Sequence, residues 1–387
     1  MAQSNDRDHF FQTSESIAAN ERRNAKSKNK AGDPIDLKAK SLGVLASENG
    51  VFVACADGAV RRIDLDSHDV AQTFTGPTAP LTSIALGRTS KGEAILFAGC
   101  WDKSIHSWSV ATGKLWKRFT GGHTDFVKCI SCATIQGEAM LITGGADAKI
   151  IIWQIETGKR LHTLTGHGRG VLDLAIDPTS PRSSTGYEEI HLFSADSVRD
   201  IKQWKITKHE ALQKLAAPIS AHQTSVNRIR FEESDGAEDD EADLWTASLD
   251  KTAKHLVRSR GWEADTVLEH PDFVKDVVVA GLQGQLVVTA CRDEEVRVWD
   301  ASSGKLICIY TGHFDEVTGL AVADGGRQLL SVSLDGTLRQ WSLDSKDMKK
   351  AMEEREKPPP KAVEEEKKES MMTAEEEAEL ADLMDSD

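Results

Sequence analysis

Residues 312–341 read GHFDEVTGLAVADGGRQLLSVSLDGTLRQW, and this stretch decides the fold. A Gly-His pair stands four residues before Val317, where an apolar run begins, and a later apolar run ends at Trp341. Short apolar runs bounded by turns that contain Gly and Asp are typical of antiparallel β-strands. The stretch therefore predicts a small β-sheet unit.

The same arrangement recurs along the chain. Histidines four residues before a valine stand at His123, His167, His222, His270 and His313. Their spacings of 44, 55, 48 and 43 residues lie near the period of about 40 to 45 residues of a four-stranded propeller blade. An aspartate six residues before each unit's closing tryptophan position extends the pattern to Asp57 and Asp102, so that we count seven units.

Four units depart from the pattern. In the fourth unit Val198 stands at the aspartate position, between Asp196 and Asp200, which leaves its turn open. In the fifth unit Leu256 replaces the tryptophan, and the first two units lack the histidine. We expect incomplete polar networks in the first, second and fifth units.

These Gly-His, Ser/Thr, Asp and Trp positions resemble the WD40 repeat family over about residues 40–343, although only Trp299-Asp300 keeps the name-giving dipeptide. The resemblance implies an all-β fold, a single seven-bladed propeller, in which these side chains form one hydrogen-bonded network per blade. Three sets match it: His123, Thr143, Asp147 and Trp153; His270, Thr289, Asp293 and Trp299; His313, Ser331, Asp335 and Trp341. We expect these residues to be structural, because buried polar groups stabilise one another when all are satisfied.

The ends of the chain predict how the ring closes. An outer strand follows the first six units, whereas charged helix formers follow Trp341. We predict that residues 33–40 supply the missing strand, because pairing removes an exposed sheet edge, and the resemblance implies the same closure. The expected divisions are a flexible basic arm (1–32), the propeller (33–343) and an acidic, partly helical tail (344–387).

The net charge of -15 is localised. Residues 232–243 carry eight acidic residues and no base, and residues 345–387 carry 15 acidic and eight basic residues. The remaining body is nearly neutral, so nucleic acid could bind only through the basic run between Arg22 and Lys30, for which a solvated tail is the alternative. With no apolar run near about 18 residues and no secretory pattern, we expect a cytoplasmic or nuclear protein that contacts no membrane, with six reduced cysteines.

No catalytic signature is found in the sequence. Three Ser/Thr-Gly-Lys pieces lie at turns and lack the rest of a phosphate loop. Cys129 and Cys132 form a lone C-x-x-C on a predicted strand, where residues three apart point to opposite faces and cannot share a metal. We therefore expect no catalytic residue, no cofactor and no metal.

One face of the propeller is predicted to bind a partner. On WD40 propellers certain repeat positions commonly line the narrower face, and here they hold Trp101, Phe126, Lys128, Asn227, Leu249, Phe273, Lys275, Arg292, Glu316, Thr318 and Leu334. Aromatic residues interleaved with Lys and Arg are typical interface anchors, although isolated exposed aromatics are also common. In the tail, Leu380, Leu383 and Met384 share one face of a candidate helix that could fold onto a partner; an inert tail is the alternative.

The sequence favours a monomeric, non-catalytic scaffold that binds other proteins within a multiprotein complex. One alternative is a substrate receptor of a ubiquitin ligase, but Trp299-Asp300-Ala301-Ser302 lacks the arginine that some such receptors carry. A second alternative is an accessory subunit of an RNA-processing or RNA-modifying complex, which only the basic arm supports.

Overall fold

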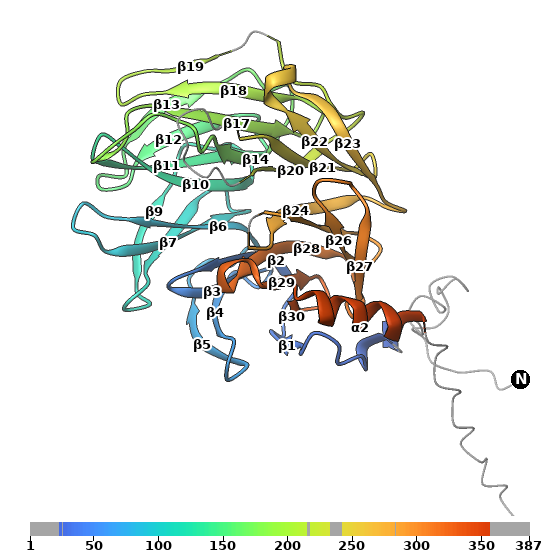
Figure 1. Cartoon of the computed structure of the whole chain (residues 1–387). Helices are drawn as coiled ribbons and strands as arrows, with labels where there is room; N and C mark the ends of the chain where they lie inside the picture. The colour runs from blue at the N-terminus through green and yellow to red at the C-terminus, as the bar shows by residue number, and fades with distance from the viewer. Residues whose placement is uncertain (1–22, 25, 215–216, 233–241, 283, 357–387) are drawn as a thin grey trace, which may run out of the picture. The chain divides into compact units, whose positions relative to one another are not determined.

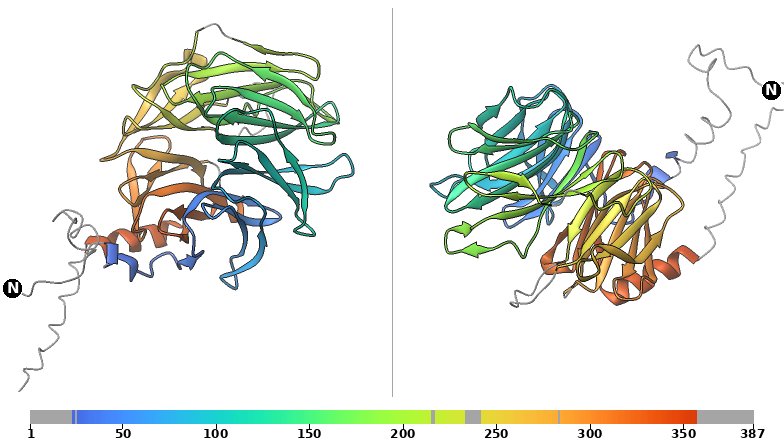
Figure 2. Two further views of the ribbon diagram at one scale, coloured as in Figure 1. Left: turned by 180° about the vertical axis from the view of Figure 1, so that it is seen from behind. Right: turned by 90° about the horizontal axis from the view of Figure 1, so that it is seen from above.

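Seven antiparallel sheets follow one another in chain order around a ring (Figures 1 and 2). The computed structural model describes residues 23–24, 26–214, 217–232, 242–282 and 284–356. The all-β, seven-bladed propeller is thereby confirmed. The predicted tail-helix residues Leu380, Leu383 and Met384 lie outside the described residues.

The first three blades use four consecutive strands each. Blade one consists of β2 (Ser41–Ser47), β3 (Gly50–Cys55), β4 (Val60–Asp64) and β5 (Asp69–Phe74). Blade two consists of β6 (Leu81–Arg88), β7 (Ala94–Cys100), β8 (Ile105–Ser109) and β9 (Leu115–Phe119). Blade three consists of β10 (Val127–Ile135), β11 (Glu138–Gly145), β12 (Ile150–Gln154) and β13 (Arg160–Leu164).

The next three blades repeat this order. Blade four consists of β14 (Val171–Ile176), β17 (Ile190–Asp196), β18 (Ile201–Ile206) and β19 (Ala211–Gln213). Blade five consists of β20 (Val226–Phe231), β21 (Leu244–Ser248), β22 (Thr252–Val257) and β23 (Glu263–Glu269), with a 3-10 turn η2 (Arg258–Arg260). Blade six consists of β24 (Val274–Ala280), β25 (Leu286–Cys291), β26 (Glu295–Asp300) and β27 (Leu306–Thr311).

Blade seven takes its outer strand from the other end of the chain. It consists of β28 (Val317–Ala323), β29 (Gln328–Ser333) and β30 (Thr337–Ser342), with a 3-10 turn η3 (Asp324–Gly326), and β1 (Ile35–Asp36) pairs with β30. The register places Ile35 opposite Leu338, and the Leu37 amide donates to the Gly336 carbonyl at 2.9 Å. The paired strand is shorter than the predicted segment 33–40.

Two side chains of β30, those of Arg339 and Trp341, hold the segment before β1. Arg339 is only 1% exposed, and its guanidinium donates to the carbonyls of Asn29 and Ala31. Gly32 has φ +71°, and a Cβ there would come within 2.7 Å of the Trp341 ring. A glycine is required because the chain crosses the indole at contact distance with a left-handed backbone.

The hydrophobic core lies between the blades. Phe52 and Phe74 of blade one, for example, pack with Leu96 and Trp108 of blade two. The second strands are apolar on both faces, since each is covered by the blades before and after it, as in β25 (LVVTAC), which is buried throughout. Each blade is therefore stabilised by its neighbours around the ring.

A hairpin and a helix are added to the seven blades. The long loop of blade four forms a hairpin, β15 (Arg182–Ser183) and β16 (Gly186–Tyr187), and β16 pairs with β10 of blade three. After blade seven comes α2 (Ser345–Glu356), whose Met348 packs against blades six and seven. In the part of the chain that is described, no helix is long and apolar enough to span a membrane.

Candidate functional site: the top face of the propeller

Histidine-centred networks tie the turns of four blades to their sheets. In each, Nδ1 of the histidine lies 2.8–2.9 Å from an aspartate oxygen and Nε2 lies 2.6–2.8 Å from a Ser or Thr hydroxyl. The sets are His123, Asp147 and Thr143; His167, Asp196 and Ser194; His222, Asp250 and Thr246; His313, Asp335 and Ser331. Asp196 thus takes the aspartate role that the sequence left open in blade four.

The tryptophans complete the networks. Trp153, Trp204 and Trp341 donate from Nε1 to the same hydroxyl that the histidine contacts, at 2.7–3.0 Å. In blade five Leu256 replaces the tryptophan, and the Thr246 hydroxyl donates to the Lys254 carbonyl, as that of Thr143 in blade three donates to the Ile151 carbonyl. Each hydroxyl therefore joins two or three buried polar groups that would otherwise lack a partner.

Blade six differs from the predicted network. Asp293 forms an ion pair with Arg297, at 2.6 and 3.1 Å, and the Nδ1 of His270 lies 3.1 Å from the Leu268 carbonyl. Thr289 still joins His270 and Trp299. The expected contact between His270 and Asp293 is thus replaced, because the two-pronged guanidinium four residues along the chain binds the carboxylate more strongly than a neutral imidazole.

Burial disfavours the charged form of three of these histidines, His123, His270 and His313. Burial lowers the pKa of His123 and of His313, even though Asp147 and Asp335 act in the opposite direction. Burial lowers the pKa of His270 to about 4. Both ring nitrogens of His123, His270 and His313 are engaged in contacts within the propeller.

One group of potential metal ligands lies in blade two. Cys100, Asp102 and His106 offer ligand atoms within 4.8 Å of one another. The carboxylate of Asp102, however, accepts hydrogen bonds from Arg118 at 2.8 Å and from Ser104 at 2.5 Å, and burial raises the pKa of the Cys100 thiol to about 11. A guanidinium on the carboxylate and a protonated thiol fit a structural turn better than a cation site.

The ring has a top face, which we define as the face carrying the turns before each inner strand and the turns between second and third strands. All seven inner strands begin with a β-bulge, visible as a register shift after their first residue. A bulge turns its extra residue out of the ladder. The bulge residues are Leu42, Thr82, Lys128, Leu172, Asn227, Lys275 and Thr318.

These seven residues line one cavity on the top face. The cavity has a volume of about 240 Å³, and Trp101, Arg228 and Glu316 complete its lining; we call it the mouth cavity. Three bulge residues also link adjacent blades, because Thr82, Asn227 and Thr318 donate to backbone carbonyls of the following blade. Leu42, Thr82 and Leu172 were not predicted from the sequence. Each directly follows the first residue of an inner strand, and this shared position could have identified them.

The predicted aromatic residues gather beside the mouth cavity in two groups. Trp101 of blade two stacks on Phe126 of blade three with ring centroids 4.9 Å apart, and Lys128 Nζ lies 5.8 Å from the Trp101 ring. In blade six the Arg292 guanidinium covers Phe273 at 4.2 Å. Trp101 is 40% exposed, which is unusual for the largest apolar side chain.

Not all of the predicted face residues meet there. Lys275 lines the mouth cavity and pairs with Glu316 at 2.8 Å. Leu249 and Leu334 lie half-buried at the corresponding turns of blades five and seven, but they do not line the cavity. The face is therefore centred on blades two, three and six.

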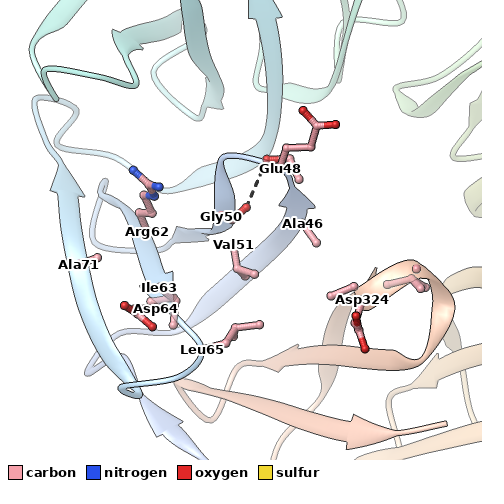
Figure 3. A pocket seen from close by; sticks show the side chains of 14 residues that line it. Ala46, Glu48, Gly50, Val51, Arg62, Ile63, Asp64, Leu65, Ala71 and Asp324 are labelled. Carbon is pink, nitrogen blue, oxygen red and sulfur yellow. Dashed lines mark hydrogen bonds between the residues drawn. The ribbon is translucent and has the colours of Figure 1, made fainter. Parts of the chain in front are cut away.

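A larger groove opens on the opposite side of blades one and seven. Its volume is about 730 Å³, with Arg62 on the blade-one wall and Asp324 on the blade-seven wall (Figure 3). Small residues, among them Ala46, Gly50 and Ala71, make it wide. Its rim carries both signs of charge, so it offers no single complementary chemistry.

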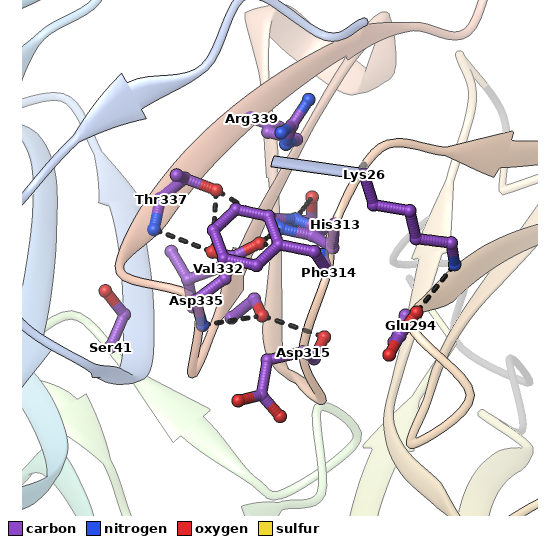
Figure 4. Close-up of polar contacts among 12 residues, drawn as sticks. Lys26, Ser41, Glu294, His313, Phe314, Asp315, Val332, Asp335, Thr337 and Arg339 are labelled. Atoms are coloured by element: carbon purple, nitrogen blue, oxygen red, sulfur yellow. Dashed lines mark hydrogen bonds and ion pairs between the residues drawn. The ribbon is translucent and has the colours of Figure 1, made fainter. Parts of the chain in front are cut away.

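The described part of the basic arm contacts blades six and seven rather than standing free. Lys26 pairs with Glu294 at 2.6 Å (Figure 4), and Arg23 pairs with Asp315 at 3.0 Å. Asn29 donates to the Thr311 carbonyl at 3.4 Å. Two of the arm's cations are thereby engaged with the propeller itself, while Lys28 and Lys30 are exposed.

Comparison with known proteins agrees with this architecture. The family described as WD domain, G-beta repeat matches residues 69–109, 113–154, 158–197 and 304–342. The uncharacterized WD repeat-containing protein C126.01c of Schizosaccharomyces pombe is 32% identical over 351 residues, which cover 88% of this chain and 90% of that protein.

Two further relatives match shorter parts. The nuclear distribution protein PAC1 of Coccidioides posadasii is 28% identical, over 47% of this chain and 41% of its own length. Human striatin-4 is 28% identical, over 48% of this chain and 23% of its own length. Its repeats, its seven blades and these relatives show that the chain belongs to the WD40 repeat family.

Proposed function

We propose that this propeller is a non-catalytic scaffold that binds other proteins through its top face within a multiprotein complex. The observation that carries the proposal is the group of aromatic and basic side chains around the mouth cavity: an exposed Trp101 stacked on Phe126, and Phe273 under Arg292. Trp, Phe and Arg at the centre of a patch are typical anchors of protein interfaces.

The arrangement of the histidines supports a binding role. The imidazoles, carboxylates and hydroxyls of the repeat are used to stabilise the blades. The side chains exposed on the top face are aromatic and basic, and such side chains suit the binding of a partner. The propeller supplies a rigid frame on which aromatic side chains keep their positions, so that little conformational entropy is lost when a partner binds.

Several features of the assembly belong to the same proposal. We expect a monomeric propeller over residues 33–343, preceded by the basic arm and followed by the acidic tail. One relative by name, the U3 small nucleolar RNA-associated protein 21 homolog of Schizosaccharomyces pombe, is 33% identical over 26% of this chain and 11% of its own length. Its name supports the nucleus as one location of the present chain, and the cytoplasm stays the other expected location.

The proposal is tested by affinity purification and mass spectrometry with the full chain. The variant W101A/F273A/R292A should lose most of the partners that the wild type captures, because it removes the exposed anchors of the top face. The control L115A/V267A/L306A removes three exposed apolar side chains from outer strands and should retain them. Partners retained by the first variant, with an unchanged melting temperature, would overturn the proposal.

A further inference from the structure

Blades three and six carry the same tetrapeptide, Asp-Phe-Val-Lys, at 125–128 and 272–275. In both, the aspartate accepts a hydrogen bond from the backbone amide of the phenylalanine at 2.8 Å, and the lysine is the bulge residue that lines the mouth cavity. The two copies thus have the same local structure. What differs is the set of side chains around them.

In blade six the copy is neutralised within the molecule. Lys275 pairs with Glu316 at 2.8 Å. Arg292 covers Phe273 and pairs with Asp272 at 2.8 Å. Every charged side chain of this copy has a partner of opposite sign, and its aromatic ring is covered.

In blade three the copy is open. Among the described residues no carboxylate forms an ion pair with Lys128, whose Nζ lies 5.7 Å from the Phe126 ring and 5.8 Å from the Trp101 ring. The position that corresponds to Arg292 is Ala146. No guanidinium at this position covers Phe126, and the indole of Trp101 stacks on it instead. We call Trp101, Phe126 and Lys128 the Lys128 corner.

The surroundings of Lys128 favour an incoming anion. Burial lowers the pKa of Lys128, and the like charge of Lys275 acts in the same direction, while Asp125 only partly opposes them. A half-buried ammonium without an ion-pair partner gains more from a carboxylate than an ammonium in water does, because the local dielectric constant is lower. The exposed face of Trp101 beside it offers apolar contact.

We propose that the Lys128 corner binds an acidic peptide segment of a partner, with a Glu or Asp carboxylate on Lys128 and a neighbouring apolar side chain on Trp101. This inference rests on the proposed binding role of the top face and names the chemistry of the partner. A carboxylate fits better than a phosphate, because phosphate recognition favours Arg, and both Arg residues near the cavity are already paired: Arg228 with Asp173 and Asp276, and Arg292 with Asp272.

The test measures binding of a fluorescently labelled peptide, Ala-Glu-Phe-Glu-Ala with blocked ends, to the full chain by fluorescence anisotropy. Lys128→Met should weaken binding about tenfold, since it removes one half-buried charge partner. Lys114→Met makes the same change of net charge on the opposite face, between β8 and β9, and should leave the affinity unchanged. Glu316→Gln frees Lys275 in the same cavity and should strengthen binding.

Two further peptides decide the chemistry. Ala-Gln-Phe-Gln-Ala and Ala-Glu-Ala-Glu-Ala should each bind at least about tenfold more weakly, because one lacks the carboxylates and the other lacks the apolar side chain. Equal affinity of the glutamine peptide, equal affinity of Lys128→Met, or a clear preference for a phosphoserine peptide would each overturn the inference.

The outcome can be separated from that of the proposed function. If W101A/F273A/R292A loses its partners while the acidic peptide does not bind the wild type, the top face is a binding face and the inference about its ligand fails. If the peptide binds through Lys128 while the triple variant keeps all its partners, the corner recognises carboxylates and the proposed function fails.

Discussion

A single hydroxyl group, that of Thr143, joins two buried side chains in blade three. His123 Nε2 lies 2.8 Å from it and Trp153 Nε1 lies 3.0 Å from it, and all three residues are buried. A valine side chain has the shape of threonine but can neither donate nor accept a hydrogen bond. The network can therefore be tested by removing one oxygen atom.

Thr143→Val should lower the free energy of unfolding by about 2–4 kcal/mol, because it leaves two buried polar groups without a partner. Thr246→Val in blade five leaves only His222 without one, since no tryptophan donates there, and should cost about 1–2 kcal/mol. Urea denaturation of both variants measures the difference. Equal losses would show that the tryptophan contact contributes nothing to stability.

His255 of blade five behaves in the opposite way to the repeat histidines. It lies 2.8 Å from Asp265 and 3.4 Å from Glu232, and its ring packs against Trp245. Burial alone would lower the pKa of His255, but Glu232 and Asp265 outweigh it and raise the pKa to about 9. The imidazole is therefore protonated at neutral pH and pairs with Asp265 on β23 and with Glu232, the residue after β20.

This pKa predicts how stability depends on pH. Because the folded pKa lies above the unfolded value of about 6.5, the contribution of His255 is complete below that pH and is lost as the pH rises to about 9. His255→Gln should flatten the stability profile between these limits. The profile below pH 6.5 should remain, since there the depressed pKa values of His123, His270 and His313 disfavour the folded state. An unaltered alkaline limb in His255→Gln would contradict the assignment.

At the level of elements, the two-residue strand β1 has the largest expected effect. β1 contributes two paired residues, yet Arg339, Trp341 and the backbone of Gly336 and Gln340 hold the chain from Asn29 to Leu37 along β30. Without this segment, β30 would present an unpaired edge, and a buried guanidinium would lose its acceptors.

Deletion of residues 1–37 should therefore yield an aggregating or unfolded protein, whereas deletion of residues 1–22 removes none of the described contacts and should leave the melting temperature unchanged. Circular dichroism and light scattering of both truncated chains provide the measurement. A soluble protein with unchanged melting after the longer deletion would refute closure by this segment.

For the whole molecule, a cluster of three charged side chains links the inner strands of four blades. Arg228 of blade five pairs with Asp173 of blade four at 3.1 Å and with Asp276 of blade six at 3.2 Å. Asp173 also accepts the Ile229 amide, and Asp276 accepts the Leu320 amide of blade seven, each at 2.9 Å. The ring is thus joined by polar contacts at its centre as well as by the apolar cores between blades.

Arg228→Met should cost about 2–4 kcal/mol, because it removes the cation that pairs with the buried carboxylate of Asp276 and leaves Asp173 with Arg230 alone. The combination D173N/R228M/D276N should recover most of that loss, since the amides are neutral and their oxygens still accept the two backbone N–H groups. Urea denaturation near neutral pH distinguishes the variants. A triple variant as unstable as Arg228→Met would mean that the guanidinium acts through packing and not through charge.

The sequence by itself determined the number of blades and most of their network residues, because the repeat places His, Ser/Thr, Asp and Trp at fixed separations within one strand-turn-strand unit. It indicated the aromatic and basic positions of the top face for the same reason. Such information is local: it depends on neighbours along the chain and on the alternation of strand faces.

Only the tertiary structure decided how equivalent residues are used. Arg297 displaces His270 from Asp293, although the motif of blade six is complete, because a nearby guanidinium competes for the same carboxylate. The two identical tetrapeptides differ in their neighbours: Lys275 pairs with Glu316 of the following blade, whereas Lys128 lies beside Trp101 of the preceding blade and has no ion-pair partner among the described residues. Contacts between blades join residues that are far apart in the chain, and a repeat read one unit at a time does not contain them.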